Sequence, residues 1–237
     1  MKAPLLDLDA LGGKQSMGTR MKVQLLYLSD PSLAIFGLGL SYGITSDMRY
    51  LQGCNVWDNN PWETLQRESC WKLAKKLAHK QGGHNKFLES ITLTLDITAP
   101  RYWWQEFDPY RIGVTKQSES TIHTLTKRDL TDGDFIVPPS KYQLEELNAL
   151  IHKYKNPKLD KYPAKRYAIF MRIKALLPEG FLQRRIVVLN AKTLQNIIAQ
   201  RIDHILDEWH IFCKRLRLEL PEFICDCVFP IESGENK

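Results

Sequence analysis

The chain has 237 residues, of which 43% are hydrophobic and 25% charged, with a formal net charge of +6. This length permits one large domain or two small ones and a sizeable core without disulfides or metals. No apolar run reaches the ~18 residues of a membrane span, because Asp30 and Pro31 interrupt the longest run. Asp7 and Asp9 stand where a signal peptide would be apolar, so we expect a cytoplasmic protein without a membrane partner.

The cysteines and the basic residues give two further expectations. The cysteines are odd in number, and the pair in "CDC" is too close for half of a usual zinc site. Reduced thiols and no metal are therefore predicted. The basic residues are spread along the chain at helical spacing, which favours solvated helix faces over a nucleic-acid surface. The positive charge is equally compatible with an anionic small substrate such as a nucleotide.

The first part of the chain predicts an arm, a strand and a helix. Residues 1–20 carry little periodic signal and are expected to be a flexible arm. Residues 21–28, "MKVQLLYL", form a short apolar run of strand length. Asp30 and Pro31 suit the N-cap and first turn of a helix that ends near Gly43.

Three glycines in this helix imitate a dinucleotide-binding motif. They are Gly37, Gly39 and Gly43 in "GLGLSYG". The dinucleotide fingerprint places its glycines directly in the turn between strand and helix. Here they fall inside the predicted helix, so close helix packing is the favoured interpretation.

The next elements are a helix, a strand and a second helix. Asn60 and Pro61 begin an amphipathic helix that ends at "QGGHNK". Residues 91–98 alternate apolar side chains with threonine and aspartate, which predicts a half-buried strand. A helix then starts at Pro100, and Pro109 ends or bends it.

The second half of the chain is mainly helical. Residues 112–122 are interpreted as a loop rich in hydroxyl groups. The other elements expected are a helix capped by Ser140, a break at 155–165, a helix at 165–177, a strand at 184–190 and one long helix at 191–218. The pattern predicts an α+β fold, with a small mostly antiparallel sheet covered by helices. We expect a single domain at 21–220 and a tail at 221–237.

Four segments, in this order, resemble the flavin-dependent thymidylate synthase family. They are "MKVQLLYLSDPSLAIFGLGLSYG", "GGHNKFLESITLTLDI", "PRYWWQEFDPYRIGVTKQSEST" and "VVLNAKTLQNIIAQRID". The second is similar to the family's Gly-His-x-x-x-(Phe/Leu)-Glu segment, and the fourth to its Asn-Ala-Arg-Ser-Leu helix with a later Leu-Arg. The third lies where the family has Arg-His-Arg followed by Ser, Asn-Glu, Ser and Arg-Tyr. Together they span about residues 21–217.

The third segment departs from the family signature. Pro109 and Tyr110 replace the first Arg and the His, while Arg111 fits the second Arg. The spacing from Arg111 to Ser120 is one residue longer than usual. The final Arg-Tyr becomes Ile122 and His123, which removes an arginine that holds the nucleotide phosphate in the family.

The resemblance implies reductive methylation of dUMP at C5. Methylenetetrahydrofolate would supply the carbon, FAD the hydride, and NADPH the electrons that regenerate the reduced flavin. The family builds its sites between the subunits of a homotetramer, so a homo-oligomer is implied. A divergent relative that modifies another pyrimidine nucleotide, and a non-catalytic nucleotide-binding or nucleic-acid-binding relative, are the alternatives.

The resemblance also assigns roles to residues of this chain. The flavin contacts would be His84, Arg111 and Asn190. The substrate contacts would be Ser118, Glu119, Ser120 and Arg201. Arg201 is also the candidate catalytic residue, because an arginine on the apolar face of the last long helix needs an anionic or carbonyl partner.

Each of these residues also has a purely structural interpretation. Arg111 could pair with Asp108 or Glu106, and Arg201 with Asp203. Asn190 could be a helix N-cap, His84 a surface residue in a turn, and residues 118–121 an exposed turn with local caps. The neighbouring tryptophans, Trp103 and Trp104, are expected in the core or in a subunit interface.

Overall fold

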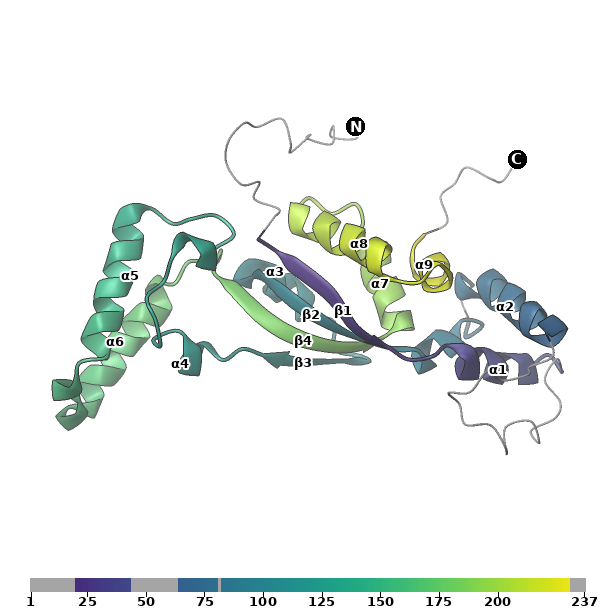
Figure 1. The fold of residues 1–237 in the computed structure, drawn as a ribbon, viewed down its shortest axis with the longest axis horizontal. Helices are drawn as coiled ribbons and strands as arrows, with labels where there is room; N and C mark the ends of the chain where they lie inside the picture. The colour runs from purple at the N-terminus through teal and green to yellow at the C-terminus, as the bar shows by residue number, and fades with distance from the viewer. Residues whose placement is uncertain (1–19, 44–63, 81, 231–237) are drawn as a thin grey trace. The chain divides into compact units, whose positions relative to one another are not determined.

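The computed structural model describes residues 20–43, 64–80 and 82–230, with only the backbone for residues 64–67. Its strands are β1 (Lys22–Leu28), β2 (Thr92–Pro100), β3 (Val114–Ser118) and β4 (Leu182–Asn190). Its α-helices are α1 (Ser32–Leu40), α2 (Thr64–Ala78), α3 (Arg101–Phe107), α4 (Thr121–Thr124), α5 (Lys141–Tyr154), α6 (Pro163–Leu176), α7 (Ala191–Arg201), α8 (Asp207–Glu219) and α9 (Glu222–Val228). Short 3₁₀ helices are η3 (Lys86–Ser90), η4 (Asp132–Asp134) and η5 (Pro157–Lys161). Figure 1 shows these elements in chain order.

The four strands form one sheet in the order β1-β2-β4-β3. Neighbouring strands run antiparallel, because backbone hydrogen bonds join the end of one strand to the start of the next. The bonds that show this are Ser29 N to Thr92 O (2.9 Å), Ala191 N to Ile91 O (2.8 Å) and Glu119 N to Arg184 O (2.9 Å). The α+β prediction with a small antiparallel sheet is confirmed.

Strand β2 shows why the sequence pattern was informative. Leu93, Leu95 and Ile97 are buried, while the alternate side chains of the strand are only half-buried. Successive side chains of a strand point to opposite faces, so a period of two places the apolar set on one face. The predicted strand at 91–98 is therefore confirmed.

The chain divides into two compact units. The first contains residues 1–23, 96–109 and 116–186, and the second contains residues 24–95, 110–115 and 187–237. Each strand of the sheet contributes residues to both units. This division does not test the single domain expected at 21–220, which stays a prediction. Residues 1–19 of the expected arm, the helix start at Asn60 and residues 231–237 of the tail lie outside the described residues.

The first unit has its core around α3 and the α5–α6 pair. Trp103, Trp104 and Phe107 are fully buried, which confirms the core interpretation of the two tryptophans. Helices α5 and α6 lie side by side (Figure 1). Their apolar faces pack with the segment that precedes α5 in a cluster of Leu125, Leu130, Phe135, Leu147, Ile151, Ile173 and Leu177. Ser140 caps α5 as predicted, because its Oγ accepts from Gln143 N at 3.2 Å.

The second unit is organised around α7, which contacts η3, α8 and α9. Gln195 of α7 is buried and donates through Nε2 to Ala78 O at 2.9 Å and to Cys227 O at 2.7 Å. Its Oε1 accepts from Asn85 Nδ2 at 3.3 Å. One side chain therefore satisfies the backbone at the ends of two other helices, α2 and α9.

Three sequence predictions are corrected by the structure. The long helix expected at 191–218 is two helices, α7 and α8, separated by residues 202–206. His204 Nδ1 accepts from Leu206 N at 3.2 Å, and Asp207 and Glu208 begin α8, where acidic residues favour a helix N-terminus. Ile205 is 90% exposed, so it does not belong to the apolar stripe that suggested a continuous helix.

The other two corrections concern segments without a clear pattern. The loop expected at 112–122 contains strand β3 and the start of α4. Backbone hydrogen bonds hold β3 to β4. Val114 is the only apolar residue of β3, so the sequence of this strand shows no alternation of apolar and polar side chains. The tail from residue 221 contains helix α9, whose Ile224, Cys227 and Val228 are buried.

The glycines of "GLGLSYG" do not form a phosphate-binding turn. Gly37 and Gly39 lie inside α1, and Gly43 adopts a φ of 64° after its end. Asp30 Oδ1 accepts from Ser32 N at 2.8 Å, but the N-cap residue of α1 is Pro31, one residue later than predicted, and it makes no side-chain cap. The rejection of the dinucleotide motif is therefore confirmed.

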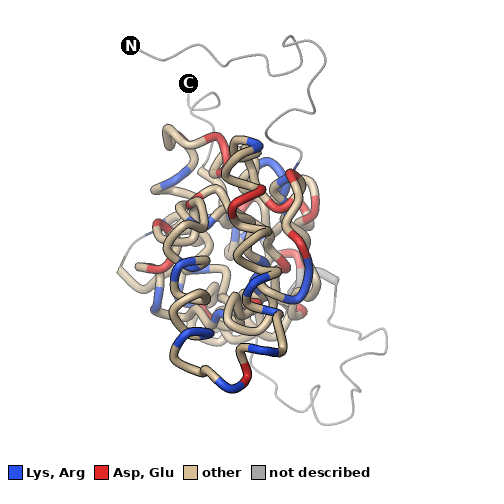
Figure 2. The backbone as a smooth tube through the Cα atoms, turned by 90° about the vertical axis from the view of Figure 1, so that its left-hand side faces the viewer, with Lys and Arg blue, Asp and Glu red and all other residues tan. Residues whose placement is uncertain are grey.

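Charged residues are mixed in sign over the described chain. Figure 2 shows Lys and Arg interspersed with Asp and Glu along the tube. Within the described residues, no helix has the length and apolar character needed to cross a bilayer. In the same part of the chain, no three His, Cys, Asp or Glu side chains gather as metal ligands would.

Candidate functional site

The loop that carries Arg111 is fixed against α7 in the second unit. Thr193 Oγ1 donates to Ile112 O at 3.0 Å, and Gly113 adopts a φ of 68°. A Cβ on Gly113 would lie 2.5 Å from Asn190 Nδ2 and 2.9 Å from Thr193 Oγ1. Glycine is needed here both for the left-handed backbone and for the close approach of the loop to the helix.

Replacing Gly113 with alanine is expected to lower the free energy of unfolding by about 2–3 kcal/mol, since it adds an unfavourable φ to a steric overlap. Urea unfolding measures this loss. The matched control is Gly37→Ala, because a Cβ on Gly37 meets no atom within 4 Å and the residue is helical. The control should keep or raise stability. An equal loss in both variants would contradict the packing account.

Arg201 is held by aromatic residues. Its Nε donates to Tyr110 Oη at 2.9 Å, and Tyr110 Oη in turn donates to Gln200 Oε1 at 2.9 Å. The guanidinium also lies 4.9 Å from the ring centroid of Trp209. These contacts orient the arginine at the end of α7 through a hydrogen bond and a cation–π interaction. They also give a structural role to Tyr110, which replaces the histidine of the family signature.

The three expected flavin contacts lie on different elements of this unit. Arg111 is exposed, and its guanidinium makes no hydrogen bond or ion pair with another described residue of its unit. Asn190 is the N-cap of α7, as its structural interpretation predicted, with Oδ1 accepting from Thr193 N at 2.8 Å. His84 is exposed in a turn after two glycines of positive φ, and the next residue, Asn85, bonds to α7. The structure therefore connects the elements of all three residues to α7.

The carboxylate of Asp108, one alternative partner for Arg111, is taken up by two other cations. Lys116 Nζ lies 3.1 Å and Arg185 Nη1 lies 2.8 Å from Asp108 Oδ1, all within the first unit. The Arg185 guanidinium also lies 4.4 Å from the Trp104 ring centroid. This ionic cluster connects the end of α3 to Lys116 of β3 and Arg185 of β4.

Residues 118–121 lie in the first unit and are held by β4. Glu119 N donates to Arg184 O at 2.9 Å, and Gln183 Nε2 donates to Glu119 O at 2.9 Å. Ser118 ends β3, and Ser120 occupies the N-cap position of α4, without a side-chain cap. The side chains of Ser118 and Glu119 are exposed. The segment is thus fixed by its backbone, and these side chains face solvent.

Lys174 is a candidate that the sequence analysis missed. It lies near the end of α6, and its partly buried Nζ donates to Thr121 Oγ1 at 2.5 Å. Burial and the nearby Arg101 guanidinium lower the pKa of Lys174. A cation that is both desolvated and close to a like charge is a favourable site for an anion. No sequence motif indicated Lys174, because a lysine between apolar residues in a helix has no special spacing.

The described cysteines belong neither to the residues around Arg201 and α7 nor to those around Lys174. Cys70, Cys213, Cys225 and Cys227 are free, as predicted for reduced cysteines, and Cys54 lies outside the described residues. Burial raises the pKa of Cys213 to about 11 and the pKa of Cys227 to about 12. Both are protonated at neutral pH and are poor nucleophiles.

Comparison with known proteins places these features in a family. The profile of a family described as "Thymidylate synthase complementing protein" matches residues 38–217. No curated protein sequence matches the chain. Two similar solved structures are from Helicobacter pylori and are flavin-dependent thymidylate synthases, ThyX, with FAD and dUMP. One is 18% identical, with a TM-score of 0.60 over 88% of this chain and 99% of that chain. The other is 16% identical, with a TM-score of 0.60 over 88% and 100%.

A third similar structure is a UMP/dUMP methylase, PolB, from Streptomyces cacaoi, bound with 5-Br dUMP. It is 15% identical, with a TM-score of 0.50 over 84% of this chain and 88% of that chain. At these identities the likeness establishes a shared fold. The family profile covers well over half of the chain.

Proposed function

The chain belongs to the thymidylate synthase complementing protein family, and on this premise we propose that it is an FAD-dependent enzyme that methylates dUMP at C5. Methylenetetrahydrofolate would be the one-carbon donor and NADPH the reductant. Support for a nucleotide substrate comes from the family and from the ligands of the similar structures. Support from this chain comes from the cations and hydroxyl groups described above.

The observation that carries the proposal is the partly buried ammonium of Lys174, which donates to Thr121 Oγ1. We propose that the phosphate of the nucleotide binds Lys174 and the hydroxyl groups of Ser120 and Thr121. The lowered pKa of Lys174 indicates that an anion there would offset an unfavourable electrostatic environment. In this position Lys174 would replace the arginine that the signature lacks at residue 122.

The residues of the second unit fit a flavin by their donor chemistry. Arg111 offers a forked guanidinium, and Asn190 retains its Nδ2 donor because the N-cap uses only Oδ1. The glycines before His84 have open space around them, so a planar ligand can approach the backbone. Bound FAD would supply the hydride that reduces the transferred carbon.

Arg201 is proposed as the residue that contacts the pyrimidine during the reaction. Tyr110 and Trp209 fix the direction of its guanidinium, so the charge needs no reorganisation when the substrate binds. A positioned cation can stabilise negative charge that develops on a carbonyl oxygen of the base. Glu119 and Ser118, exposed beside β4, remain proposed substrate contacts.

The direct test is product analysis. Purified protein loaded with FAD is incubated with dUMP, methylenetetrahydrofolate and NADPH, and the nucleotides are separated and weighed by mass spectrometry. The proposal expects dTMP, and expects none when FAD is omitted from protein stripped of flavin. Unchanged dUMP from a flavin-loaded, folded protein would contradict it.

A second candidate function is methylation of another pyrimidine nucleotide. The observation that favours it is Tyr110, which occupies the histidine position of the signature and is used to hold Arg201. The fold shared with a UMP/dUMP methylase gives UMP as the first alternative substrate. The same assay with UMP and dCMP separates the candidates, because only the true substrate should give a methylated product.

We further propose that the enzyme works as a homotetramer in the cytoplasm, as the family resemblance implies. Light scattering coupled to size-exclusion chromatography should report about four times the chain mass of 27.5 kDa. A monomer with full activity would contradict the tetramer and leave the reaction unaffected.

A further inference from the structure

A cavity of about 780 Å³ lies within the first unit. Glu119, a proposed substrate contact, is among its lining residues, whereas Lys174 and Thr121 are not. Cavities of this size hold small-molecule ligands. The basic side chains that line it are Arg20, Lys22, Lys127, Arg128 and Arg184. Its acidic lining residues are Glu119 and Asp134, so the lining carries a formal charge of +3. The cations come from three separate stretches of chain.

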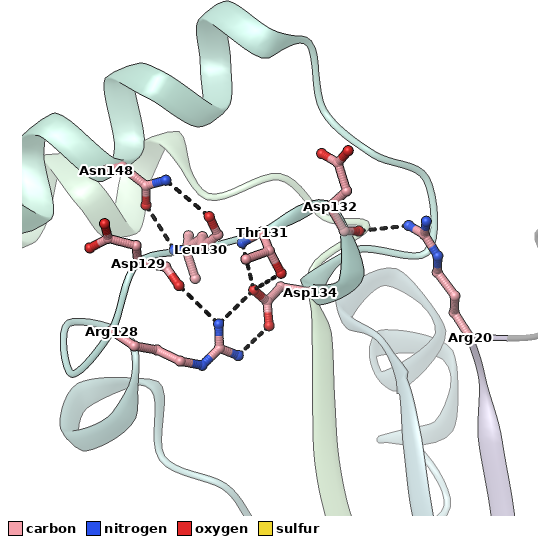
Figure 3. Close-up of polar contacts among 8 residues, drawn as sticks. All are labelled: Arg20, Arg128, Asp129, Leu130, Thr131, Asp132, Asp134 and Asn148. Carbon is pink, nitrogen blue, oxygen red and sulfur yellow. Dashed lines mark hydrogen bonds and ion pairs between the residues drawn. The ribbon is translucent and has the colours of Figure 1, made fainter.

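One wall of the cavity is built by residues 128–135 and is fixed by a polar network (Figure 3). Arg128 donates to both carboxylate oxygens of Asp134 and, at 3.0 Å, to Asp129 O. Asn148 of α5 bonds to both the N–H and the carbonyl of Leu130, at 2.8 and 2.9 Å. The wall is therefore held in one conformation, which reduces the ordering cost of binding a ligand.

Part of the positive charge is not compensated by the described residues. Arg20 donates through Nη1 to the carbonyls of Asp132 and Phe135, at 2.6 and 2.8 Å, and forms no ion pair with a described carboxylate. The ammonium groups of Lys22 and Lys127 likewise have no hydrogen bond or ion pair with a described side chain or backbone group. Arg128, in contrast, is neutralised by Asp134. Arg20, Lys22 and Lys127 thus leave a cationic lining that attracts an anion.

The remaining lining is apolar or hydroxylic. Phe181, Leu182, Leu125 and Leu130 contribute apolar surface. Thr98 and Thr124 add hydroxyl groups. Cations beside an aromatic and aliphatic surface suit a ligand with a phosphoryl end and a flat, weakly polar body.

We propose that this cavity binds a nucleotide that carries a diphosphate group. Arg20, Lys22 and Lys127 would contact the phosphoryl oxygens, and Phe181 with the leucines would contact the base or sugar. A diphosphate is preferred over a monophosphate because its charge is spread over two groups, as the uncompensated cations are spread over residues 20–22 and residue 127. The inference concerns binding alone and does not require the proposed reaction.

The test is calorimetric titration of the full chain with ADP, inorganic pyrophosphate and adenosine. ADP and pyrophosphate should bind, and adenosine should not, since it lacks the phosphoryl groups. The Lys127→Gln variant should weaken ADP binding on the order of tenfold, and the Arg20→Gln/Lys127→Gln variant on the order of a hundredfold. Lys141→Gln, an exposed lysine of the same unit outside the cavity, should leave the affinity unchanged. Thermal unfolding of each variant checks that the fold is retained.

Several outcomes would overturn the inference. No binding of ADP or pyrophosphate at millimolar concentration would remove the site, and equal affinity of the wild type and of folded Lys127→Gln would remove the assigned residues. Pyrophosphate binding as tight as ADP would overturn the nucleotide part, because the apolar wall would then contribute nothing. Lys174→Met should leave ADP binding intact, since Lys174 does not line the cavity.

Failure of this inference is distinguishable from failure of the proposed function. A protein that forms dTMP while ADP binding is absent keeps the function and loses the cavity assignment. A protein without flavin or product that binds ADP through Lys127 keeps the cavity assignment and loses the function.

Discussion

Replacing Lys174 with methionine is expected to raise the KM for dUMP by about 30- to 100-fold, the loss of one or two charge-assisted hydrogen bonds to phosphate. Methionine keeps the length and apolar stem of the side chain and removes the ammonium. FAD content should not change, because no residue proposed to contact the flavin lies on α6. Steady-state kinetics with FAD-loaded protein measure the effect.

In Lys174→Met, the affinity for dUMP should fall, whereas the stability of the fold should stay equal or rise. Burial and Arg101 lower the pKa of Lys174, so the charged side chain destabilises the fold. The unfolded chain binds more protons between the lowered pKa and the usual value, so stability rises with pH across that window. Without the ammonium this dependence disappears, and the unfolding midpoint at neutral pH should be equal to or higher than that of the wild type.

Two further variants separate a phosphate contact from a purely structural role. Lys174→Arg should recover most of the affinity, since it restores a cation that can contact phosphate. Lys153→Met, on an exposed position of α5, should change neither KM nor stability. An unchanged KM for dUMP in a folded Lys174→Met protein would show that the phosphate binds elsewhere.

Replacing Gln195 with alanine is expected to destabilise the protein by about 4 kcal/mol. The change deletes the two hydrogen bonds that Gln195 Nε2 donates and the two that its Oε1 accepts from Asn85 and Lys192. It also leaves the buried acceptor of Cys227 without this donor and creates a small cavity. Because these bonds join α7 to the ends of α2 and α9, the loss should affect the helices around the proposed flavin contacts. Urea unfolding gives the free energy, and the flavin content of the purified variant should fall as well.

The control for Gln195 lies on the next residue of the same helix. Asn196 is exposed on α7, and its side chain has no hydrogen bond with a described residue, so Asn196→Ala should stay within about 0.5 kcal/mol of the wild type. If Gln195→Ala were as stable as Asn196→Ala, the buried amide would not be the connection between these helices.

The sequence predicted the elements whose side chains carry a periodic or capping signal. The apolar and polar side chains of β2 alternate, and Ser140 caps the start of α5, so both elements could be predicted from their own residues. Strand β3 exists because β4 offers it backbone partners, which its own residues do not reveal. The break between α7 and α8 depends on a local bond of His204 and on the acidic start of α8, and both were hidden by continuous helical spacing.

The candidate site was predictable only where a motif exists. Asn190 follows a strand and starts a helix, so its capping position could be read from the sequence. The pairing of Tyr110 with Arg201 joins residues 91 positions apart, and the contact of Lys174 with Thr121 joins residues 53 apart. Contacts of this kind arise from the fold and leave no local trace in composition or spacing.

The most direct test of the central claim is the flavin absorbance spectrum of the protein titrated with dUMP. The account predicts bound FAD with bands in the visible range, and a saturable change of those bands on addition of dUMP, because the proposed reaction transfers a hydride from the flavin to the carbon attached to the nucleotide. The same titration of Lys174→Met should saturate only at much higher dUMP. A protein that retains no added FAD, or a bound flavin whose spectrum ignores dUMP at any concentration, would contradict the account.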